Sequence, residues 1–256
     1  MALDSLLEEF YTKTGIVFTD KHENIKSKIH RFSEREGFTS IDEFVTALQS
    51  DKTLYERLTN LLTVSETYFF RELQQIKLFL DSVKSKKNAP LKILCAPCAS
   101  GEEPYTLLIA LHEAGFSLDK ISLYGIDINS DEIAKAKAAS YAPRRLHKLS
   151  EKEIDTYFSA EENSYVLKQD IRKHAHFSQL NIFEVWPAEL NNFDVIFSRN
   201  MLIYFDEKAK KKSEEIFYKK LSPGGALFLG HADIIPNSVG FKKEVKNGIS
   251  YYRKEG

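Results

Sequence analysis

The chain has 256 residues, of which 43% are hydrophobic and 12% aromatic, and this composition excludes a disordered or collagen-like protein. Its 36 basic and 37 acidic residues give a net charge of −1, so the charge balance indicates neither a nucleic-acid partner nor an anionic membrane. The two cysteines, Cys95 and Cys98, are too few for a disulfide framework.

Acidic residues near the start, Asp4, Glu8 and Glu9, stand where a signal peptide has its basic and apolar regions. No stretch approaches the ~18 apolar residues of a membrane-spanning helix. We therefore expect a cytoplasmic protein with no direct membrane insertion.

Residues 1–80 predict an all-α N-terminal domain, because apolar residues recur there at helical spacing. Ser40 or Thr39 is placed to cap the second helical segment, with Glu43 at the capping-box position. The polar segment 81–90 ends in a proline and predicts a linker. The apolar faces are formed by Leu3, Leu6, Leu7 and Phe10, by Ile41, Phe44, Val45 and Leu48, and by Leu54, Leu58, Leu61 and Leu62.

Residues 91–256 alternate between short apolar runs and helical stretches, which predicts a parallel, doubly wound sheet with buried strands. Near the C-terminus, Asn247-Gly248 separates two β-rich runs and predicts a terminal antiparallel hairpin. Two further short runs, 164–168 and 175–179, predict a small β-subdomain inserted at about 150–180. The main strands are predicted at 91–96, 121–126, 193–198 and 226–230, and the helices at 104–114, 130–140 and 206–221.

Polar residues follow the predicted strands, where ligands bind in an open parallel sheet. The loop after the first strand has only Gly101, so it lacks a dinucleotide fingerprint. Glu102 and Glu103 then begin a helix, where they would repel a phosphate and attract an ammonium or hydroxyl groups, or serve only as ordinary helix-start residues. Asp127, at the tip of the second strand, is either a ribose anchor or a turn or N-cap residue. A ligand with a ribose and an ammonium but no phosphate fits this pattern, and S-adenosylmethionine is such a molecule.

The predicted strand at 193–198 is followed by Arg199, Asn200 and Tyr204. Burial of such side chains costs free energy unless they meet polar partners, which favours a binding role. The alternative is that Tyr204 and Phe205 belong to the core and Asp206 is an N-cap.

Four motifs stand along the chain in a specific order and spacing: Thr67-Tyr68-Phe69-Phe70-Arg71, Gly101-Glu102-Glu103-Pro104-Tyr105, Asp127-Ile128-Asn129 and Arg199-Asn200-Met201-Leu202-Ile203-Tyr204-Phe205. Together they resemble the CheR family of chemoreceptor glutamate methyltransferases, and the resemblance covers roughly residues 10–253. It implies an α/β, Rossmann-like S-adenosylmethionine-dependent methyltransferase domain at 91–256, with the inserted β-subdomain and terminal hairpin, after the all-α domain. It also implies that methyl groups pass to glutamates of chemoreceptor cytoplasmic helices in chemotactic adaptation, leaving S-adenosylhomocysteine.

The resemblance carries over site residues where the motifs match. It gives Arg71 and Tyr204 catalytic roles, Arg71 in orienting the incoming carboxylate and the cofactor, and Tyr204 in supporting the sulfonium. A glutamate side chain is already ionised at neutral pH, so no general base is expected. No metal site is expected either, because His174 and His176 lack a third ligand. The implied cofactor contacts are Ser65, Thr67, Arg71, Glu102, Asp127, Asn181, Ile182, Arg199 and Asn200.

The resemblance also implies that the protein substrate docks along a basic helix of the N-terminal domain. The resemblance suggests that Lys26, Lys28, Arg31 and Arg35 contact the receptor helices, although a solvated face is the ordinary interpretation of such charges. The segment 157–171 is short for a subdomain that captures a C-terminal receptor pentapeptide, so we expect no pentapeptide tether. The sequence Gly230-His231-Ala232-Asp233 replaces the usual Gly-His-Ser-Glu of the family and predicts a change at the pocket rim.

Two other functions compete with this one: a CheR-like methyltransferase of another signalling array, and a non-catalytic cofactor-sensing adaptor. Retention of Arg71 and Tyr204 argues against the adaptor. A nucleic-acid methyltransferase is disfavoured by the neutral charge and by Arg199-Asn200-Met201 after the predicted strand at 193–198, where an Asn/Asp-Pro-Pro-aromatic run would stand.

Overall fold

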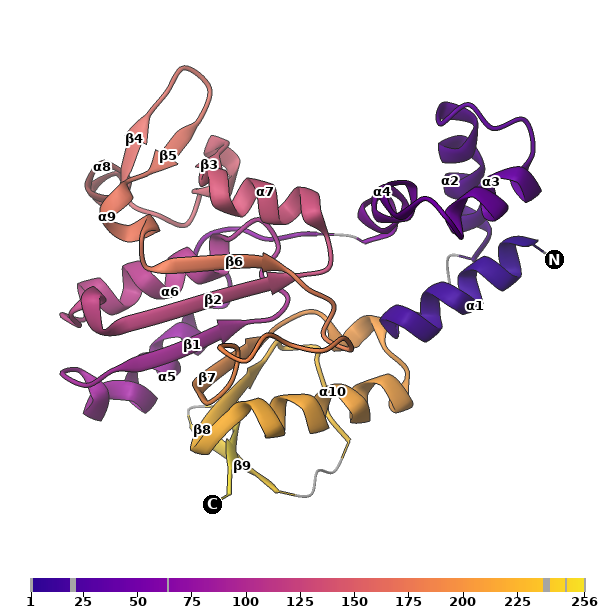
Figure 1. The fold of residues 1–256 in the computed structure, drawn as a ribbon. Coiled ribbons are helices and arrows are strands. Elements are labelled where there is room, and N and C mark those ends of the chain that lie inside the picture. Colours follow the sequence, from indigo (N-terminus) through magenta and orange to yellow (C-terminus); the bar gives the residue numbers. More distant parts are fainter. Residues whose placement is uncertain (1, 19–21, 64, 237–239, 247, 256) are drawn as a thin grey trace.

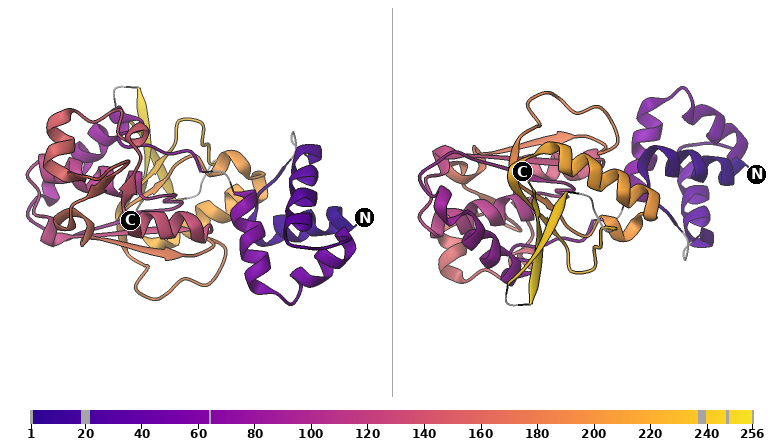
Figure 2. Two further views of the ribbon diagram at one scale, coloured as in Figure 1. Left: turned by 90° about the horizontal axis from the view of Figure 1, so that it is seen from above. Right: turned by 90° about the horizontal axis from the view of Figure 1, so that it is seen from below.

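The computed structural model describes residues 2–18, 22–63, 65–236, 240–246 and 248–255. It has two bodies, a helical unit at the N-terminal end and a larger domain built on a sheet (Figure 1). All the views place the helical unit beyond one end of the sheet domain (Figure 2).

The helical unit is the predicted all-α fold. Its hydrophobic core includes Phe10, Ile29, Phe44 and Leu58, each with no exposed side-chain surface. Ser40 caps the third helix by accepting a hydrogen bond from the Glu43 N–H, at 3.2 Å. The described helices here are α1 (Ala2–Thr14), α2 (His22–Arg35), α3 (Ile41–Leu48) and α4 (Lys52–Leu62).

The sheet domain confirms the predicted Rossmann-like architecture. In the part of the chain that is described, its main sheet has seven strands in the order β6-β2-β1-β7-β8-β10-β9. The first five in this order are parallel, and the terminal hairpin of β9 and β10 is antiparallel, as predicted from Asn247-Gly248, although Asn247 itself lies outside the described residues. The bounds are β1 (Leu91–Cys95), β2 (Ile121–Asp127), β6 (Ala175–Gln179), β7 (Phe193–Ser198), β8 (Leu221–Leu229), β9 (Phe241–Lys246) and β10 (Ile249–Lys254).

Both faces of this sheet are buried, as the apolar runs predicted. Leu91 and Ile93 of β1 pack into one hydrophobic cluster, whereas Leu94 packs into another, because successive strand residues point to opposite faces. The first cluster also holds α5 (Leu73–Val83), α6 (Glu102–Glu113) and α7 (Ser130–Ala138), and the second holds α10 (Glu207–Lys220). The chain leaves β1 in one direction toward β2 and β6 and returns to β7 on the other side, so a topological switch point lies between β1 and β7.

The small inserted β-subdomain is present, but one of its predicted strands belongs elsewhere. Residues 175–179 form β6, which pairs in parallel with β2 at the edge of the main sheet. Phe177 is buried in the main core, and a five-residue run carries no signal of which sheet it will join. The subdomain sheet instead takes β3 (Ser140–Tyr141), β4 (Phe158–Ala160) and β5 (Tyr165–Leu167), accompanied by α8 (Glu151–Tyr157) and α9 (Gln169–Arg172).

Helix α5 packs differently from the expected end of the all-α domain near residue 80. Its residues Ile76, Phe79 and Val83 belong to the hydrophobic cluster of the sheet, not to that of the helical unit. The expected linker contains the 3-10 helix η2 (Lys84–Lys86), which leads from α5 into β1. Helical periodicity reveals an apolar face but not the core that the face covers, and this explains the difference.

Polar contacts hold the two bodies together at the carboxyl edge of the sheet. The Asn60 amide donates to the Ser130 hydroxyl at 2.9 Å and accepts from the Ser130 N–H at 3.0 Å. On the other side, the Tyr11 hydroxyl donates to the Asp206 carboxylate at 2.6 Å, and Asp206 also caps α10. The helical unit therefore closes over the loops that follow the strands.

Candidate active site

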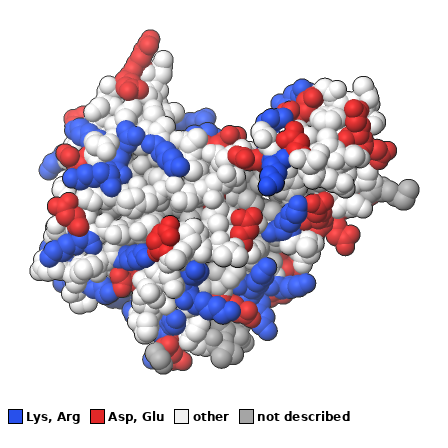
Figure 3. All heavy atoms as spheres, viewed as in Figure 1, with Lys and Arg blue, Asp and Glu red and all other residues white. Residues whose placement is uncertain are grey.

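A cavity of about 440 Å³ lies between the two bodies, at the carboxyl ends of β1, β2 and β7. Figure 3 shows a notch between them on this side of the molecule. The helical unit contributes Ile16 and Ile25 to the wall, and the sheet domain contributes the loops after its strands. Of the predicted site residues, the cavity is lined by Ser65, Thr67, Arg71, Asp127, Asn181, Ile182, Arg199, Asn200 and Tyr204, but not by Glu102.

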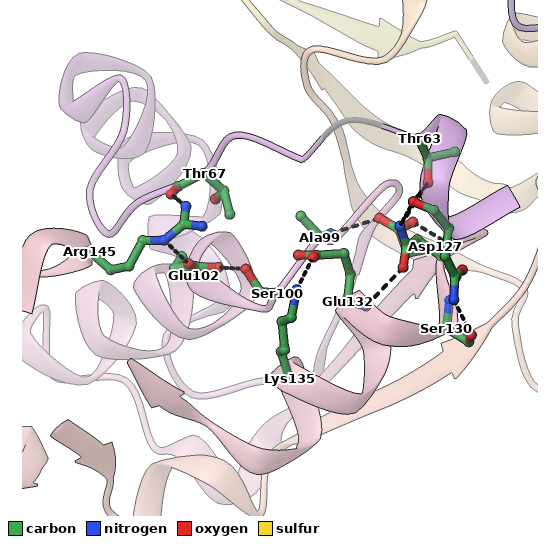
Figure 4. A network of polar contacts seen from close by, with 12 residues as sticks. Thr63, Thr67, Ala99, Ser100, Glu102, Asp127, Ser130, Glu132, Lys135 and Arg145 are labelled. Atoms are coloured by element: carbon green, nitrogen blue, oxygen red, sulfur yellow. Dashed lines mark hydrogen bonds and ion pairs between the residues drawn. The ribbon is translucent and has the colours of Figure 1, made fainter. Parts of the chain in front are cut away.

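Asp127 is held by backbone donors at the end of β2. Its carboxylate accepts from the Ala99 N–H and from the Asn129 N–H, each at 2.9 Å, and the Ala99 contact is visible in Figure 4. The N-cap of α7 is Asn129, which accepts from the Glu132 N–H, so Asp127 is not the cap. Burial raises the pKa of Asp127 to about 6, although the two backbone hydrogen bonds oppose the shift. A buried carboxylate fixed in this way is a ready acceptor for hydroxyl groups.

Arg199, which is buried, forms an ion pair with the partly buried Glu103 on the neighbouring wall. The Arg199 guanidinium is 2.7 Å from the Glu103 carboxylate and 3.3 Å from that of Glu72, and it donates to the Arg71 carbonyl at 2.9 Å. Glu103 keeps one carboxylate oxygen, Oε1, buried without a hydrogen-bond partner among the described residues. Burial raises the pKa of Glu103, and Arg199 opposes that shift. The Glu103 side chain also lines the cavity and is 14% exposed, so its carboxylate can meet a cationic group there, whereas the buried Oε1 is closed off from the cavity.

Glu102, one of the expected cofactor contacts, does not line the cavity. Its side chain is fully buried outside the cavity wall, where it accepts from the Ser100 hydroxyl at 2.8 Å and lies 3.6 Å from Arg145 Nε (Figure 4). Successive helix residues point about 100° apart, so only one of two adjacent acids faces the cavity. The helix begins after Gly101, whose φ of +91° and whose close approach to Ala136, 3.0 Å from an added Cβ to Ala136 Cβ, require a glycine.

Arg71, Tyr68 and Tyr204 form the more exposed side of the cavity. Arg71 donates to the Glu66 carbonyl at 2.6 Å, and its guanidinium carbon lies 5.9 Å from the centre of the Tyr68 ring. Tyr204 ends the 3-10 helix η5 (Leu202–Tyr204), and 40% of it is exposed. Its carbonyl accepts from the Val17 N–H at 2.9 Å, which ties this loop to the helical unit. The predicted catalytic pair is thus brought to one cavity.

Asn181 and Ile182 line the cavity from the segment after β6. The Asn181 amide donates to the Lys13 carbonyl at 2.7 Å, and its oxygen accepts from the Phe183 N–H at 3.0 Å. Ile182 is buried in the second hydrophobic cluster of the sheet. These contacts fix the segment against α1 and leave an amide and an apolar side chain toward the cavity.

Asp233 supports the loop that carries Tyr204, a role that the sequence did not reveal. Its carboxylate accepts from the N–H groups of Asn200, of Gly230 at 3.0 Å and of Ile203 at 3.2 Å. Asn200 has a φ of +58°, a left-handed conformation that these bonds stabilise. Asp233 is buried and does not line the cavity. The departure from the family pattern at this position therefore affects the support of the loop that carries Asn200, and not the pocket rim as expected. The only sequence signal was its difference from the family pattern.

The four basic residues predicted to dock the substrate occupy different environments on α2. Lys26 pairs with Asp4 at 2.8 Å, and Lys28 donates to the Leu61 carbonyl at the end of α4. Burial lowers the pKa of Lys28. Arg31 and Arg35 are exposed, with the Arg35 guanidinium 5.8 Å from the Phe32 ring. Two of the four side chains are therefore occupied inside the helical unit, and docking by the others stays a prediction.

The described helices include none with the length and apolar character needed to span a membrane. The described residues also include no cluster of three or more histidine, cysteine or acidic side chains that could hold a metal ion.

Comparison with known proteins identifies the family. A model described as "CheR methyltransferase, all-alpha domain" matches residues 1–63, and one described as "CheR methyltransferase, SAM binding domain" matches residues 65–249. The chain is 37% identical over 255 residues to a chemotaxis protein methyltransferase of Campylobacter jejuni subsp. jejuni serotype O:23/36, covering 99% of this chain and 96% of that protein. It is 33% identical over 259 residues to chemotaxis protein methyltransferase 2 of Vibrio cholerae serotype O1, covering 95% and 90%. The chain therefore belongs to the CheR methyltransferase family and is an S-adenosylmethionine-dependent methyltransferase.

Proposed function

We propose that this methyltransferase transfers methyl groups to glutamate side chains on the cytoplasmic helices of chemoreceptors, forming methyl esters in chemotactic adaptation. The observation that carries the proposal is one cavity with the buried Asp127 and the partly buried Glu103 on one side, and with the partly exposed Arg71 and the exposed Tyr204 on the other. The buried side suits a small cation that lacks phosphate, and the exposed side suits a carboxylate presented by another protein.

The residues present fit S-adenosylmethionine. Asp127 offers a fixed carboxylate to the ribose hydroxyls, and the Glu103 carboxylate, which lines the cavity beside Arg199, offers an acceptor to the ammonium of the methionine part. Asn181 and Ile182 supply an amide and an apolar surface for the adenine. When bound, the cofactor supplies a methyl group activated by a positively charged sulfur.

Arg71 and Tyr204 act on the acceptor side. A glutamate carboxylate with an ordinary pKa near ~4.3 is already ionised, so the chain has to orient it and exclude water rather than remove a proton. Arg71 pairs with the incoming carboxylate, and Tyr204 places its ring or hydroxyl beside the sulfonium. Neutralisation of opposite charges in the transition state is less penalised in a site that is closed to water.

The substrate helix is proposed to dock against the exposed Arg31 and Arg35 of α2. No pentapeptide tether is proposed, because the β4–β5 connection is only a tight turn. In that turn the Glu161 N–H donates to the Ser164 carbonyl at 2.8 Å. Micromolar binding of a receptor C-terminal pentapeptide would contradict this part of the proposal.

The test is to incubate the purified chain with methyl-labelled S-adenosylmethionine and chemoreceptor cytoplasmic fragments. We expect label on the fragment that is released by base, because methyl esters hydrolyse in base. Label that resists base would point to a different acceptor atom. Binding of the cofactor with no transfer to any receptor fragment would favour a sensing adaptor.

A further inference from the structure

A cationic surface that the proposed reaction does not use lies next to the exposed side of the cavity. We define the η4 rim as Arg144, His147 and Lys148, which lie in or directly after the 3-10 helix η4 (Pro143–Arg145). All three side chains are exposed. Within the described part of the chain, neither Arg144 nor Lys148 makes an ion pair.

The η4 rim is fixed against the wall of the cavity. The Phe69 N–H donates to the Arg145 carbonyl at 3.1 Å, and the Arg145 guanidinium donates to the Thr67 carbonyl (Figure 4). The His147 ring lies 4.8 Å from the Tyr68 ring, centre to centre. Since Thr67 and Tyr68 both line the cavity, the rim borders its opening rather than a remote surface.

The local acids do not neutralise this rim. Glu153 accepts hydrogen bonds from the Ser150 N–H and hydroxyl as part of the capping box of α8. Glu151 and Glu66 are exposed, and Arg71 adds a further, partly exposed cation beside Tyr68. With Glu153 held in the capping box, the cations Arg71, Arg144 and Lys148 outnumber the exposed acids Glu66 and Glu151 at this border of the cavity.

We propose that the η4 rim is a second docking site for the acidic substrate helix, separate from α2. The proposal rests on the proposed function, because its occupant is a helix that presents a glutamate to the cavity. Both Ile25 of α2 and Tyr68 beside the rim contribute to the cavity wall. A helix advances 1.5 Å per residue, so one that places a glutamate in the cavity extends past both borders within a few turns. Acidic residues near the target glutamate then meet α2 on one side and the rim on the other.

The experiment uses the full chain with the charge-reversed variant Arg144→Glu/Lys148→Glu. The matched control, Lys242→Glu/Lys243→Glu, makes the same change of charge on exposed residues of β9, at the opposite edge of the main sheet. We expect the KM for the receptor fragment to rise about tenfold in the rim variant, with kcat at saturation and the affinity for S-adenosylmethionine within about twofold of wild type. The control is expected to leave all three values near wild type.

A neutral variant, Arg144→Gln/Lys148→Gln, guards against an effect of charge reversal on folding. We expect a smaller rise in KM and a weaker dependence of kcat/KM on salt than in wild type. An unchanged KM in the rim variant, or an equal rise of KM in the control, would contradict the proposal that the η4 rim is a docking site, while the proposed function would stand. Failure of the wild-type chain to methylate the fragment instead overturns the proposed function, and the rim proposal with it.

Discussion

The cavity has two unlike sides. On the closed side, Asp127 and Arg199 are buried, Glu103 is partly buried, and all three are held by hydrogen bonds or ion pairs that come mainly from the loops after the strands. On the open side, Tyr68, Arg71 and Tyr204 are partly or largely exposed and make few contacts. The difference indicates that the closed side is preorganised to bind a small ligand, whereas the open side gains its remaining contacts when a partner protein binds.

The largest effect is expected from Arg71→Ala on the open side. Removal of the guanidinium that orients the carboxylate should lower methyl transfer by about 10²- to 10³-fold. The fold should persist, because the described hydrogen bond of the Arg71 guanidinium is to one nearby carbonyl. Turnover is measured with labelled cofactor, and Arg71→Lys serves as the charge-retaining control. Near wild-type turnover of Arg71→Ala would remove this residue from the site.

Asp127→Ala tests the closed side. The loss of charge-assisted hydrogen bonds to the ribose should weaken S-adenosylmethionine binding by about 10- to 100-fold, as measured by calorimetry. The control is Asp131→Ala, which removes an exposed acid from the first turn of α7. Unchanged affinity in Asp127→Ala would show that the ribose is held elsewhere.

Glu102 and Glu103 allow the closed side to be tested at adjacent positions. Glu103→Gln should weaken cofactor binding about tenfold, since a neutral amide replaces the acceptor for the ammonium. Glu102→Gln should leave the affinity nearly unchanged but lower the free energy of unfolding by about 1–3 kcal/mol, because Arg145 loses its buried partner. Calorimetry and urea denaturation measure the two effects. Weaker cofactor binding in Glu102→Gln, with unchanged binding in Glu103→Gln, would show that Glu102 contacts the cofactor.

The pKa of Asp127, about 6, predicts that the affinity for S-adenosylmethionine, which binds on the closed side, depends on pH. Hydroxyl groups bind best to the ionised carboxylate, so the affinity for S-adenosylmethionine should fall severalfold as pH drops from 7 to 5. The contribution of this group to stability has the opposite sign: its folded pKa lies above its unfolded pKa, so the contribution grows as pH falls through 6. Titration of cofactor affinity with pH checks the prediction. A profile for Asp127→Asn as steep as that of wild type would assign the dependence to another group, such as Glu103.

The smallest effect is expected at the edge of the open side. Arg31→Ala/Arg35→Ala should raise the KM for the receptor fragment about three- to fivefold, because exposed charge pairs contribute little individually. Lys26→Ala is the matched comparison, since Lys26 is already paired with Asp4. A larger rise for Lys26→Ala than for the arginine pair would place docking on the other side of α2.

Much of the site was predictable because polar residues after buried strands converge at one edge of a parallel sheet. That rule brought Asp127, Arg199 and Asn200 to the cavity, and the resemblance added Arg71, Tyr204 and the segment at Asn181. Asp233 was not predictable in this way, because its role consists of hydrogen bonds to backbone groups about 30 residues away in the chain.

The sequence by itself determined the helical and strand elements, the terminal hairpin and the acids at the strand ends, because periodicity and turn chemistry act between neighbouring residues. Only the tertiary structure decided that residues 175–179 join the main sheet, that α5 covers that sheet, and that Glu103 rather than Glu102 faces the cavity. Each of these outcomes depends on contacts with distant segments: the pairing with β2, the packing against the sheet and the Arg145 and Arg199 partners of the two acids. The local sequence pattern indicates that an apolar face must be buried or that a charge needs a partner, and the tertiary contacts determine which residues bury or pair with it.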